Sequence, residues 1–147
     1  MARVGIPRGL FFFYQYPLWK TFFTDLGAEV ITSSPTSRQT IDQGIDSTVD
    51  ECCLPIKVYF GHVGQLLEQQ PDYILAPRFI SIEPRSYICP KFMGIPHMIR
   101  AQWPHCPPLI DITVDCSRDT RELWNNIYRA GLLFTGSRKS IYDAYQH

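Results

Sequence analysis

Two cysteines in matching local settings are the residues of this chain best placed to do chemistry. Cys53 begins the run Cys-Leu-Pro-Ile-Lys, and Cys89 begins the run Cys-Pro-Lys-Phe. In each run a proline follows within two residues, a lysine comes next, and an apolar helical pattern begins. Because proline is favoured in the first turn of a helix, both cysteines are predicted to lie just before helix N-termini. Free backbone N–H groups and the helix dipole favour a thiolate there. Two thiolates placed alike, about 36 residues apart, indicate a shared role, which we interpret as iron–sulfur ligation.

The other cysteines carry weaker signals, and a core role stays open for every one of them, because free cysteine is among the most buried residue types. Cys52 adjoins Cys53, and adjacent side chains at a helical start point about 100° apart, so only one of the two is expected to reach a given site. Cys116 follows the fourth expected strand and is a third candidate metal ligand. A zinc site is not favoured, because a four-ligand set at paired spacing is missing around three further candidates, His97, His105 and Cys106.

Six polar side chains are candidates for binding a cofactor: Arg8, Lys57, His62, Arg78, Glu83 and Lys91. His62 lies inside an expected helix between Gly61 and Gly64. Glycine in a helix costs about 1 kcal/mol, which indicates close backbone packing or a nearby ligand. The alternative is a histidine satisfied within a tight helix–sheet contact.

The charged residues that follow the strands could bind a ligand or serve only within the fold. Arg8 follows the first expected strand and could meet an anion at the edge of the sheet. Arg78 and Glu83 frame the loop after the third strand, where they could pair with each other, contact a partner, or be solvated loop charges.

Composition narrows the class of protein. The chain has 147 residues, 45% hydrophobic and 19% charged, so it is expected to form one globular α/β domain over residues 1–147. Fourteen basic residues balance fourteen acidic ones, and no basic run stands out, which argues against non-specific binding to nucleic acid. The motifs of P-loop and dinucleotide-binding proteins and of serine hydrolases are missing.

The expected location is the cytoplasm. The N-terminus lacks the long apolar segment of a signal peptide, and no apolar run is long enough to span a membrane. Five cysteines is an odd number without the spacing of a secreted disulfide scaffold, so reduced thiols are expected.

Strand and helix patterns alternate along the chain. Strands are expected at residues 3–6, 29–32, 72–77 and 109–114. Helices are expected at residues 10–26, 39–49, 55–69, 90–100, 119–133 and 140–145, and residues 78–87 are expected to form an irregular loop. Since parallel strands need helical crossovers, this order predicts an open sheet of about four mainly parallel strands with helices on both faces. Ligands collect at the carboxyl ends of the strands in such sheets, where Arg8, Ser33, Cys89 and Cys116 would lie.

The first helix offers a specific prediction about packing. A stripe at four-residue spacing is expected to share one face, with Trp19 and Phe23 flanking it: Tyr14, Leu18, Phe22 and Leu26. Pro17 is expected in the first turn, and Gly27 is expected to end the helix.

Several segments taken together resemble the acyl-CoA dehydratase activase-related proteins, which are similar to the iron–sulfur subunits of 2-hydroxyacyl-CoA dehydratases. The match runs in order from about Arg3 to Arg100, and its cysteine motifs are specific to the group. Its segments are Gly5-Ile6-Pro7-Arg8, Trp19-Lys20-Thr21-Phe22-Phe23, Leu26-Gly27-Ala28-Glu29-Val30, Cys53-Leu54-Pro55-Ile56-Lys57, Gly61-His62, Pro77-Arg78 and the run from Tyr87 to Pro96.

The resemblance implies a three-layer Rossmann-like domain that forms the first half of a two-domain subunit. In the related dehydratases three cysteines hold a [4Fe-4S] cluster between two such domains. Cys53 matches the first ligand, and Cys89 is a candidate for the second. The third resembles a cysteine of the following domain, which these 147 residues do not contain. Either another domain or subunit completes the site, or Cys116 substitutes, or no cluster is bound.

The implied activity is single-electron transfer, with an ATP-dependent activator and an acyl-CoA as further partners. Two alternatives are a non-catalytic interaction domain with structural cysteines and an acyl-CoA-binding domain without metal.

Overall fold

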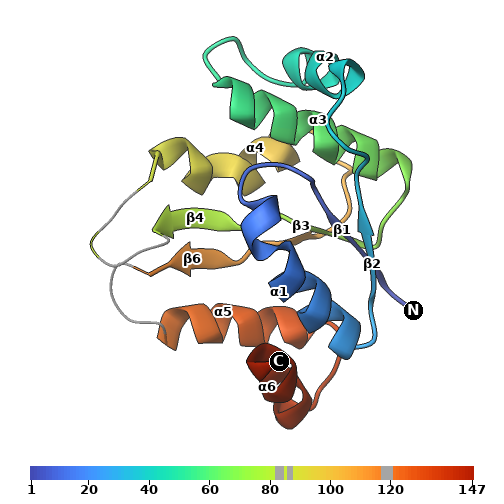
Figure 1. Ribbon diagram of the computed structural model, residues 1–147, viewed down its shortest axis with the longest axis vertical. Helices are drawn as coiled ribbons and strands as arrows, with labels where there is room; N and C mark the ends of the chain where they lie inside the picture. Colours follow the sequence, from blue (N-terminus) through green and yellow to red (C-terminus); the bar gives the residue numbers. More distant parts are fainter. Residues whose placement is uncertain (82–84, 86–87, 117–120) are drawn as a thin grey trace.

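The computed structural model describes residues 1–81, 85, 88–116 and 121–147 (Figure 1). Glu83, expected as a binding residue, lies outside these residues, as do the first two residues of the helix expected at 119–133. The strands are β1 (Arg3–Ile6), β2 (Glu29–Thr32), β3 (Tyr73–Leu75), β4 (Arg78–Ser81), β5 (Leu109–Ile110) and β6 (Thr113–Asp115). The helices are α1 (Phe12–Asp25), α2 (Arg38–Asp46), α3 (Leu54–Glu68), the 3₁₀ helix η1 (Pro90–Gly94), α4 (Ile95–Gln102), α5 (Arg121–Gly131) and α6 (Arg138–Gln146).

The central sheet is parallel and has the strand order β2-β1-β3-β5. β1 and β2 pair in register from Arg3 with Glu29 to Ile6 with Thr32, as expected for two short apolar strands. The order reverses at β1, because β2 lies on one side of it and β3 on the other. The expected open, parallel α/β sheet is confirmed.

The fourth expected strand, at residues 109–114, is interrupted near its middle, and the third, at residues 72–77, ends early at Leu75. β4 and β6 continue β3 and β5 as a separate two-stranded parallel sheet. Backbone hydrogen bonds cross the interruption, from Ala76 N to Ile110 O (3.0 Å) and from Arg78 N to Ile112 O (2.8 Å). The expectation that residues 78–87 form only an irregular loop was wrong at its start, because Arg78–Ser81 pairs with β6. Alternation of buried Phe79 and Ser81 with half-buried neighbours marks this segment as a strand.

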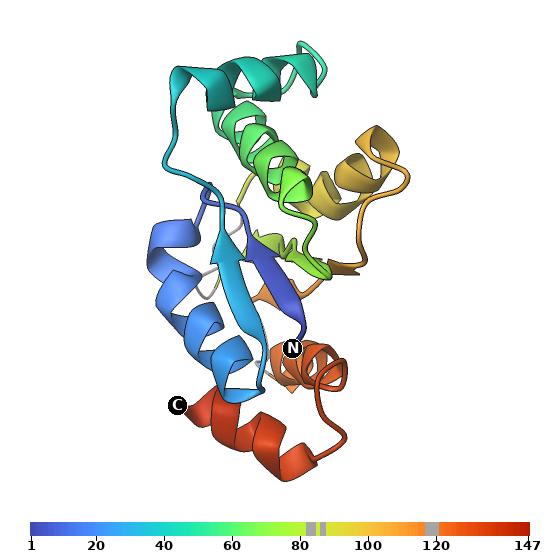
Figure 2. The ribbon, with the colours of Figure 1, turned by 90° about the vertical axis from the view of Figure 1, so that its right-hand side faces the viewer.

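Helices cover both faces of the strands. Figures 1 and 2 show α1, α5 and α6 on one side and α3 and α4 on the other, with α2 lying outside α3. The first side packs a core that includes Val4, Phe23, Leu75, Ile112 and Ile127. The second packs Ile56, Phe60, Ile74, Ile95 and Ile99. Neighbouring residues Ile74 and Leu75 therefore face opposite cores, as the period of two along a strand requires.

The expected stripe of α1 does not share one face, because Phe22 is buried while two of its other residues are exposed. Tyr14 is 88% exposed and Leu18 is 44% exposed, whereas the buried residues are Phe12, Trp19, Phe22 and Phe23. Four-residue steps advance 40° beyond a full helical turn, so a stripe of three such steps drifts about 120° around the helix. Pro17 also lies beyond the first turn, because the helix begins at Phe12.

The end of α1 follows the expectation. Gly27 has φ of 85°, which a residue without Cβ adopts at little cost. Its N–H donates to Thr24 O, and Ala28 N–H donates to Phe23 O, so the pair forms a Schellman motif.

The outer helix α2 packs directly on the backbone of α3. Ser37 caps α2, accepting from Thr40 N while the Thr40 hydroxyl accepts from Ser37 N, and together they form a capping box. A Cβ added to Gly44 would lie 1.7 Å from Lys57 O, and one added to Gly61 would lie 2.0 Å from Thr40 O. Close backbone packing therefore explains the glycine that precedes His62. No helix within the described residues is both long and apolar enough to cross a membrane.

Candidate functional site

Cys53 occupies the N-cap of α3, as the sequence predicts. Its backbone is extended, its carbonyl accepts from Lys57 N (3.1 Å), and Pro55 lies in the first turn. The thiol side chain is exposed. It makes no capping hydrogen bond, so it is available to a ligand outside the domain.

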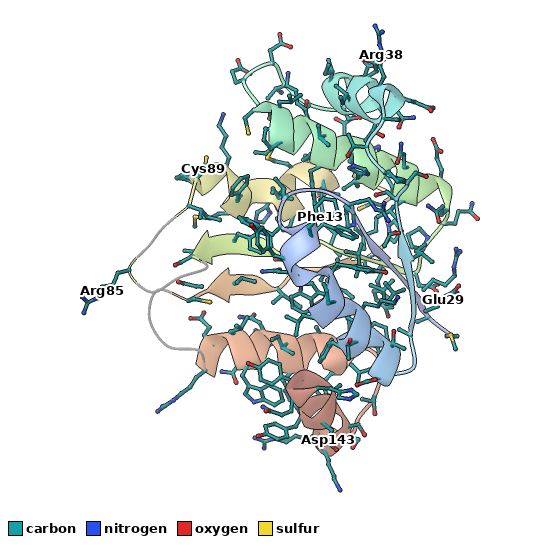
Figure 3. All side chains as sticks on the ribbon, in the orientation of Figure 1. Phe13, Glu29, Arg38, Arg85, Cys89 and Asp143 are labelled. Carbon is teal, nitrogen blue, oxygen red and sulfur yellow. The ribbon has the colours of Figure 1, made fainter. Side chains whose placement is uncertain are left out.

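Cys89 occupies the equivalent position before η1. Its carbonyl accepts from Phe92 N (3.1 Å), Pro90 opens the helix, and the side chain is exposed. η1 runs directly into α4, so the expected 90–100 helix exists as a 3₁₀ turn followed by an α-helix. Figure 3 shows Cys89 at the side of the molecule toward which β4 and β6 point, and Figure 1 shows α3 beginning on the same side.

A hydrogen bond connects the two cysteine segments. Lys91 Nζ donates to Glu51 O over 2.8 Å, although the residues are 40 positions apart in the chain. Cys52 turns the other way, because it is buried in the core between the sheet and α3. The two adjacent thiols therefore differ in exposure, since Cys53 is exposed and Cys52 is buried.

Cys116 lies at the same edge of the sheet but packs toward the opposite face. It follows β6, and its backbone N–H donates to Ser81 O (2.9 Å). Its side chain contacts the core beneath α1 and α5, and it lines a pocket of about 420 Å³ with Trp19, Leu123 and Tyr145 among its walls. In the part of the chain that the structure describes, no three His, Cys, Asp or Glu side chains gather closely enough to hold a metal ion. Cys116 as a third ligand stays a prediction.

His62 is fully buried and has both ring nitrogens paired. Ser33 Oγ lies 2.7 Å from Nδ1, and Thr36 Oγ1 lies 2.8 Å from Nε2. Burial, followed by the positive charge of Arg8, lowers the pKa of His62 to about 4. The imidazole is therefore neutral near pH 7 and ties the β2–α2 loop to α3. This arrangement fits a histidine whose two ring nitrogens are hydrogen-bonded within the fold better than a histidine that faces a ligand.

Arg8 belongs to the same network through its backbone. Its N–H donates to Ser33 Oγ (3.0 Å), while its guanidinium lies over the Phe12 ring, with Cζ 5.5 Å from the centroid. Arg8 Nε is buried and has no hydrogen-bond partner among the described residues. The expected edge position of this arginine is confirmed, because it follows β1 by two residues.

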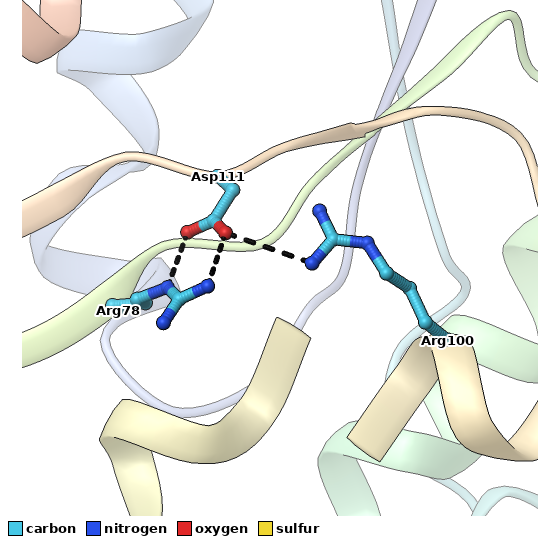
Figure 4. Close-up of polar contacts among 3 residues, drawn as sticks. All are labelled: Arg78, Arg100 and Asp111. Carbon is cyan, nitrogen blue, oxygen red and sulfur yellow. Dashed lines mark hydrogen bonds and ion pairs between the residues drawn. The ribbon is translucent and has the colours of Figure 1, made fainter. Parts of the chain in front are cut away.

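Arg78 is held by a carboxylate that the sequence analysis missed. Its Nε and Nη2 donate to Asp111 Oδ1 (2.8 Å) and Oδ2 (2.7 Å), and Arg100 approaches Oδ2 at 3.8 Å (Figure 4). These hydrogen bonds raise the pKa of Arg78. The Arg78–Asp111 pair links the start of β4 to the segment between β5 and β6. Arg78 therefore holds together the two strands at the point where they are interrupted. The sequence signal that could have identified this carboxylate is that Asp111 is the one charged residue within the largely apolar run 109–114.

The two candidate lysines accompany the cysteines. Lys57 lies one turn after Cys53 and is half-buried, and Lys91 lies two residues after Cys89 and is exposed. Ser33 and Thr36, which bind His62, were not identified beforehand as site residues. Their position in a Ser/Thr-rich loop after β2 was the only signal.

Comparison with known proteins identifies one family. A family model described as a CoA enzyme activase uncharacterised domain (DUF2229) matches residues 3–147. No curated protein matches the chain, and no solved structure does.

Proposed function

Since the chain belongs to the family of CoA enzyme activase uncharacterised domains, as the resemblance to activase-related proteins predicts, we propose that it supplies Cys53 and Cys89 to a [4Fe-4S] cluster. The cluster would serve a redox system like that of the 2-hydroxyacyl-CoA dehydratases and their activators. The whole of residues 3–147 matches the family, so the cysteine segments lie within the matched region.

One observation carries the proposal. Cys53 and Cys89 are exposed thiols that begin two helices, and the Lys91–Glu51 hydrogen bond holds their segments together. Exposed cysteine is unusual, because the residue is normally buried like Cys52. Two exposed thiols on neighbouring segments therefore suit a role as metal ligands better than a role in packing.

The donor set fits half of a cluster site. Cubane clusters of this type are held by cysteine thiolates, and this domain offers two of them at one edge. The remaining ligands come from a second domain or subunit that covers this edge, since Cys116 packs toward the other face. Such a cluster, when bound, carries one electron at a time.

The residues around the two thiols have specific roles in this proposal. Cys53 and Cys89 are the N-cap residues of α3 and η1, whose first-turn backbone N–H groups have no partner within the helix. Lys91 fixes the distance between the segments through Glu51. Burial of Cys52 anchors the first segment in the core. An ATP-dependent activator as electron donor and an acyl-CoA as substrate are the partners that this role requires.

Anaerobic purification with the neighbouring domain or subunit tests the proposal. We expect a brown protein with iron and sulfide near four each per assembled site, and loss of most iron in Cys53→Ser and Cys89→Ser. Cys106→Ser is the matched control, because Cys106 precedes β5 and so lies at the opposite edge of the sheet. A colourless, iron-free assembly would falsify the proposal, as would equal iron in all three variants.

An acyl-CoA-binding domain without metal is the second candidate. The pocket beside Cys116 favours it, because 420 Å³ is within the usual range for small-molecule sites and its walls are largely apolar. Calorimetric titration with a CoA thioester separates the candidates. Under the second candidate, binding persists unchanged in the Cys53→Ser/Cys89→Ser double variant, which has lost any cluster.

A further inference from the structure

Arg8 differs from the other partly buried arginine of the sheet edge in having no partner for its charge. Arg78 donates two hydrogen bonds to Asp111, whereas the Arg8 side chain makes no ion pair or hydrogen bond with any described residue. Its Nε is buried, and its guanidinium lies over the ring of Phe12. A buried donor without an acceptor is unfavourable, so this guanidinium lacks the anion that would complete it.

The position of Arg8 in the topology is that of a ligand-binding residue. The strand order reverses at β1, and the helices that follow β1 and β2 cover opposite faces. In open parallel sheets the crevice for a ligand lies at this reversal, at the carboxyl ends of the strands. Arg8 lies in the loop that leaves β1 at that point.

The surroundings leave the positive charge unopposed. The first turn of α1 contains no acidic residue. His62 lies close enough to feel the charge of Arg8, and it is neutral because burial and Arg8 itself hold its pKa low. The two hydroxyls near His62 are occupied with its ring nitrogens. No group of this network can therefore neutralise the guanidinium.

We propose that Arg8, at the β1–α1 loop, binds one anionic phosphate or carboxylate group. Guanidinium presents Nε and one Nη as a fork that matches either oxyanion with two parallel hydrogen bonds. Turning that fork away from the Phe12 ring exposes Nε and gives it the acceptor that it lacks. This site is separate from the cysteines, because Arg8 neighbours His62, more than two helical turns into α3 from Cys53.

The Arg8 Nε–Hε resonance in nitrogen-15 NMR spectra reports the site directly. We titrate the full chain with inorganic phosphate and, separately, with sodium acetate, at ionic strength held constant with sodium chloride. The expected result is a saturable shift of this resonance, accompanied by a shift of the His62 ring signals. Tighter binding of phosphate assigns the site to a phosphate group, and tighter binding of acetate assigns it to a carboxylate.

Two variants and a control decide the outcome. Both variants lack the Arg8 resonance, so their binding is read from the His62 ring signals. Arg8→Gln weakens binding at least tenfold, and Arg8→Lys, which keeps the charge but loses the fork, weakens it severalfold. Lys20→Gln leaves binding unchanged, because Lys20 is an exposed cation over the Tyr16 ring of the same helix, with Nζ 5.7 Å from the centroid. The absence of a saturable shift with either anion, or equal weakening in Lys20→Gln, overturns the proposal. Iron content is measured in parallel and is expected to stay unchanged in the Arg8 variants.

Discussion

Lys91 reaches across 40 residues of chain to the backbone carbonyl of Glu51, with Nζ and O 2.8 Å apart. This bond joins the loop before α3 to the turn before α4, and these are the segments that carry Cys53 and Cys89. The lysine that follows each Cys–Pro motif is therefore not equivalent in the two motifs, since Lys57 lies within α3.

Lys91→Met removes this connection while keeping the length of the side chain. We expect Cys53 and Cys89 to be joined efficiently by a short bifunctional thiol reagent in the wild type, and several times less efficiently in the variant. Peptide mass spectrometry measures the yield. Because Lys91 is exposed, the free energy of unfolding should change by less than about 1 kcal/mol. Equal yields in both proteins would contradict this role of Lys91.

His62 makes stability depend on pH between its unfolded and folded pKa values. The unfolded chain protonates this ring near pH 6.5, whereas the folded protein does so only near pH 4. The unfolded state thus binds more protons in this window, and stability falls as the pH is lowered through it, by about 2–3 kcal/mol. Urea unfolding of the wild type and of His62→Gln at pH 7, 5.5 and 4.5 measures the difference. The variant should be less stable at pH 7 and lose this part of the slope; parallel profiles would argue against the neutral buried ring.

Asp111 forms ion pairs with two arginines at the interruption of the strands, a close one with Arg78 and a longer one with Arg100. Asp111→Asn leaves Arg78 without its carboxylate, and we expect a loss of about 1–3 kcal/mol in the free energy of unfolding. Arg100→Gln removes only the longer contact at 3.8 Å, from a side chain that is 46% exposed, and should cost less than about 0.5 kcal/mol. Chemical denaturation compares the two. Similar losses would mean that the bidentate pair is not the main contribution.

Gly61 and Gly64 lie in the same helix, but replacing each of them by alanine is expected to change the free energy of unfolding in opposite directions. In Gly61→Ala the new methyl group meets Thr40 O of α2, so the helices must separate, at a cost of more than about 2 kcal/mol. In Gly64→Ala the nearest atom is a ring carbon of Trp103 at 3.8 Å, and better helix propensity should stabilise the protein by about 0.5–1 kcal/mol. Thermal and urea unfolding provide the comparison, and destabilisation by both substitutions would show that the packing of α2 is not responsible.

The sequence alone determined the features that depend on local chemistry. Proline after each cysteine placed Cys53 and Cys89 at helix N-termini, Gly27 ended α1 with a positive φ, and Ser37 capped α2. The alternation of strands and helices was sufficient to predict the parallel α/β sheet. All of these features could be predicted because each depends on residues that are close together in the chain.

Only the tertiary structure decided which distant groups meet. Asp111 is an unremarkable aspartate until the interrupted strands bring it to Arg78, and the partners of His62 come from a loop that precedes it by 26 residues or more. The buried face of α1 also depended on the whole sheet, since Tyr14 and Trp19 are both aromatic and only the position of the core separates them. Contacts between residues far apart in the chain depend on how the elements pack and on which charges become buried. A pattern of neighbouring residues contains no information on either.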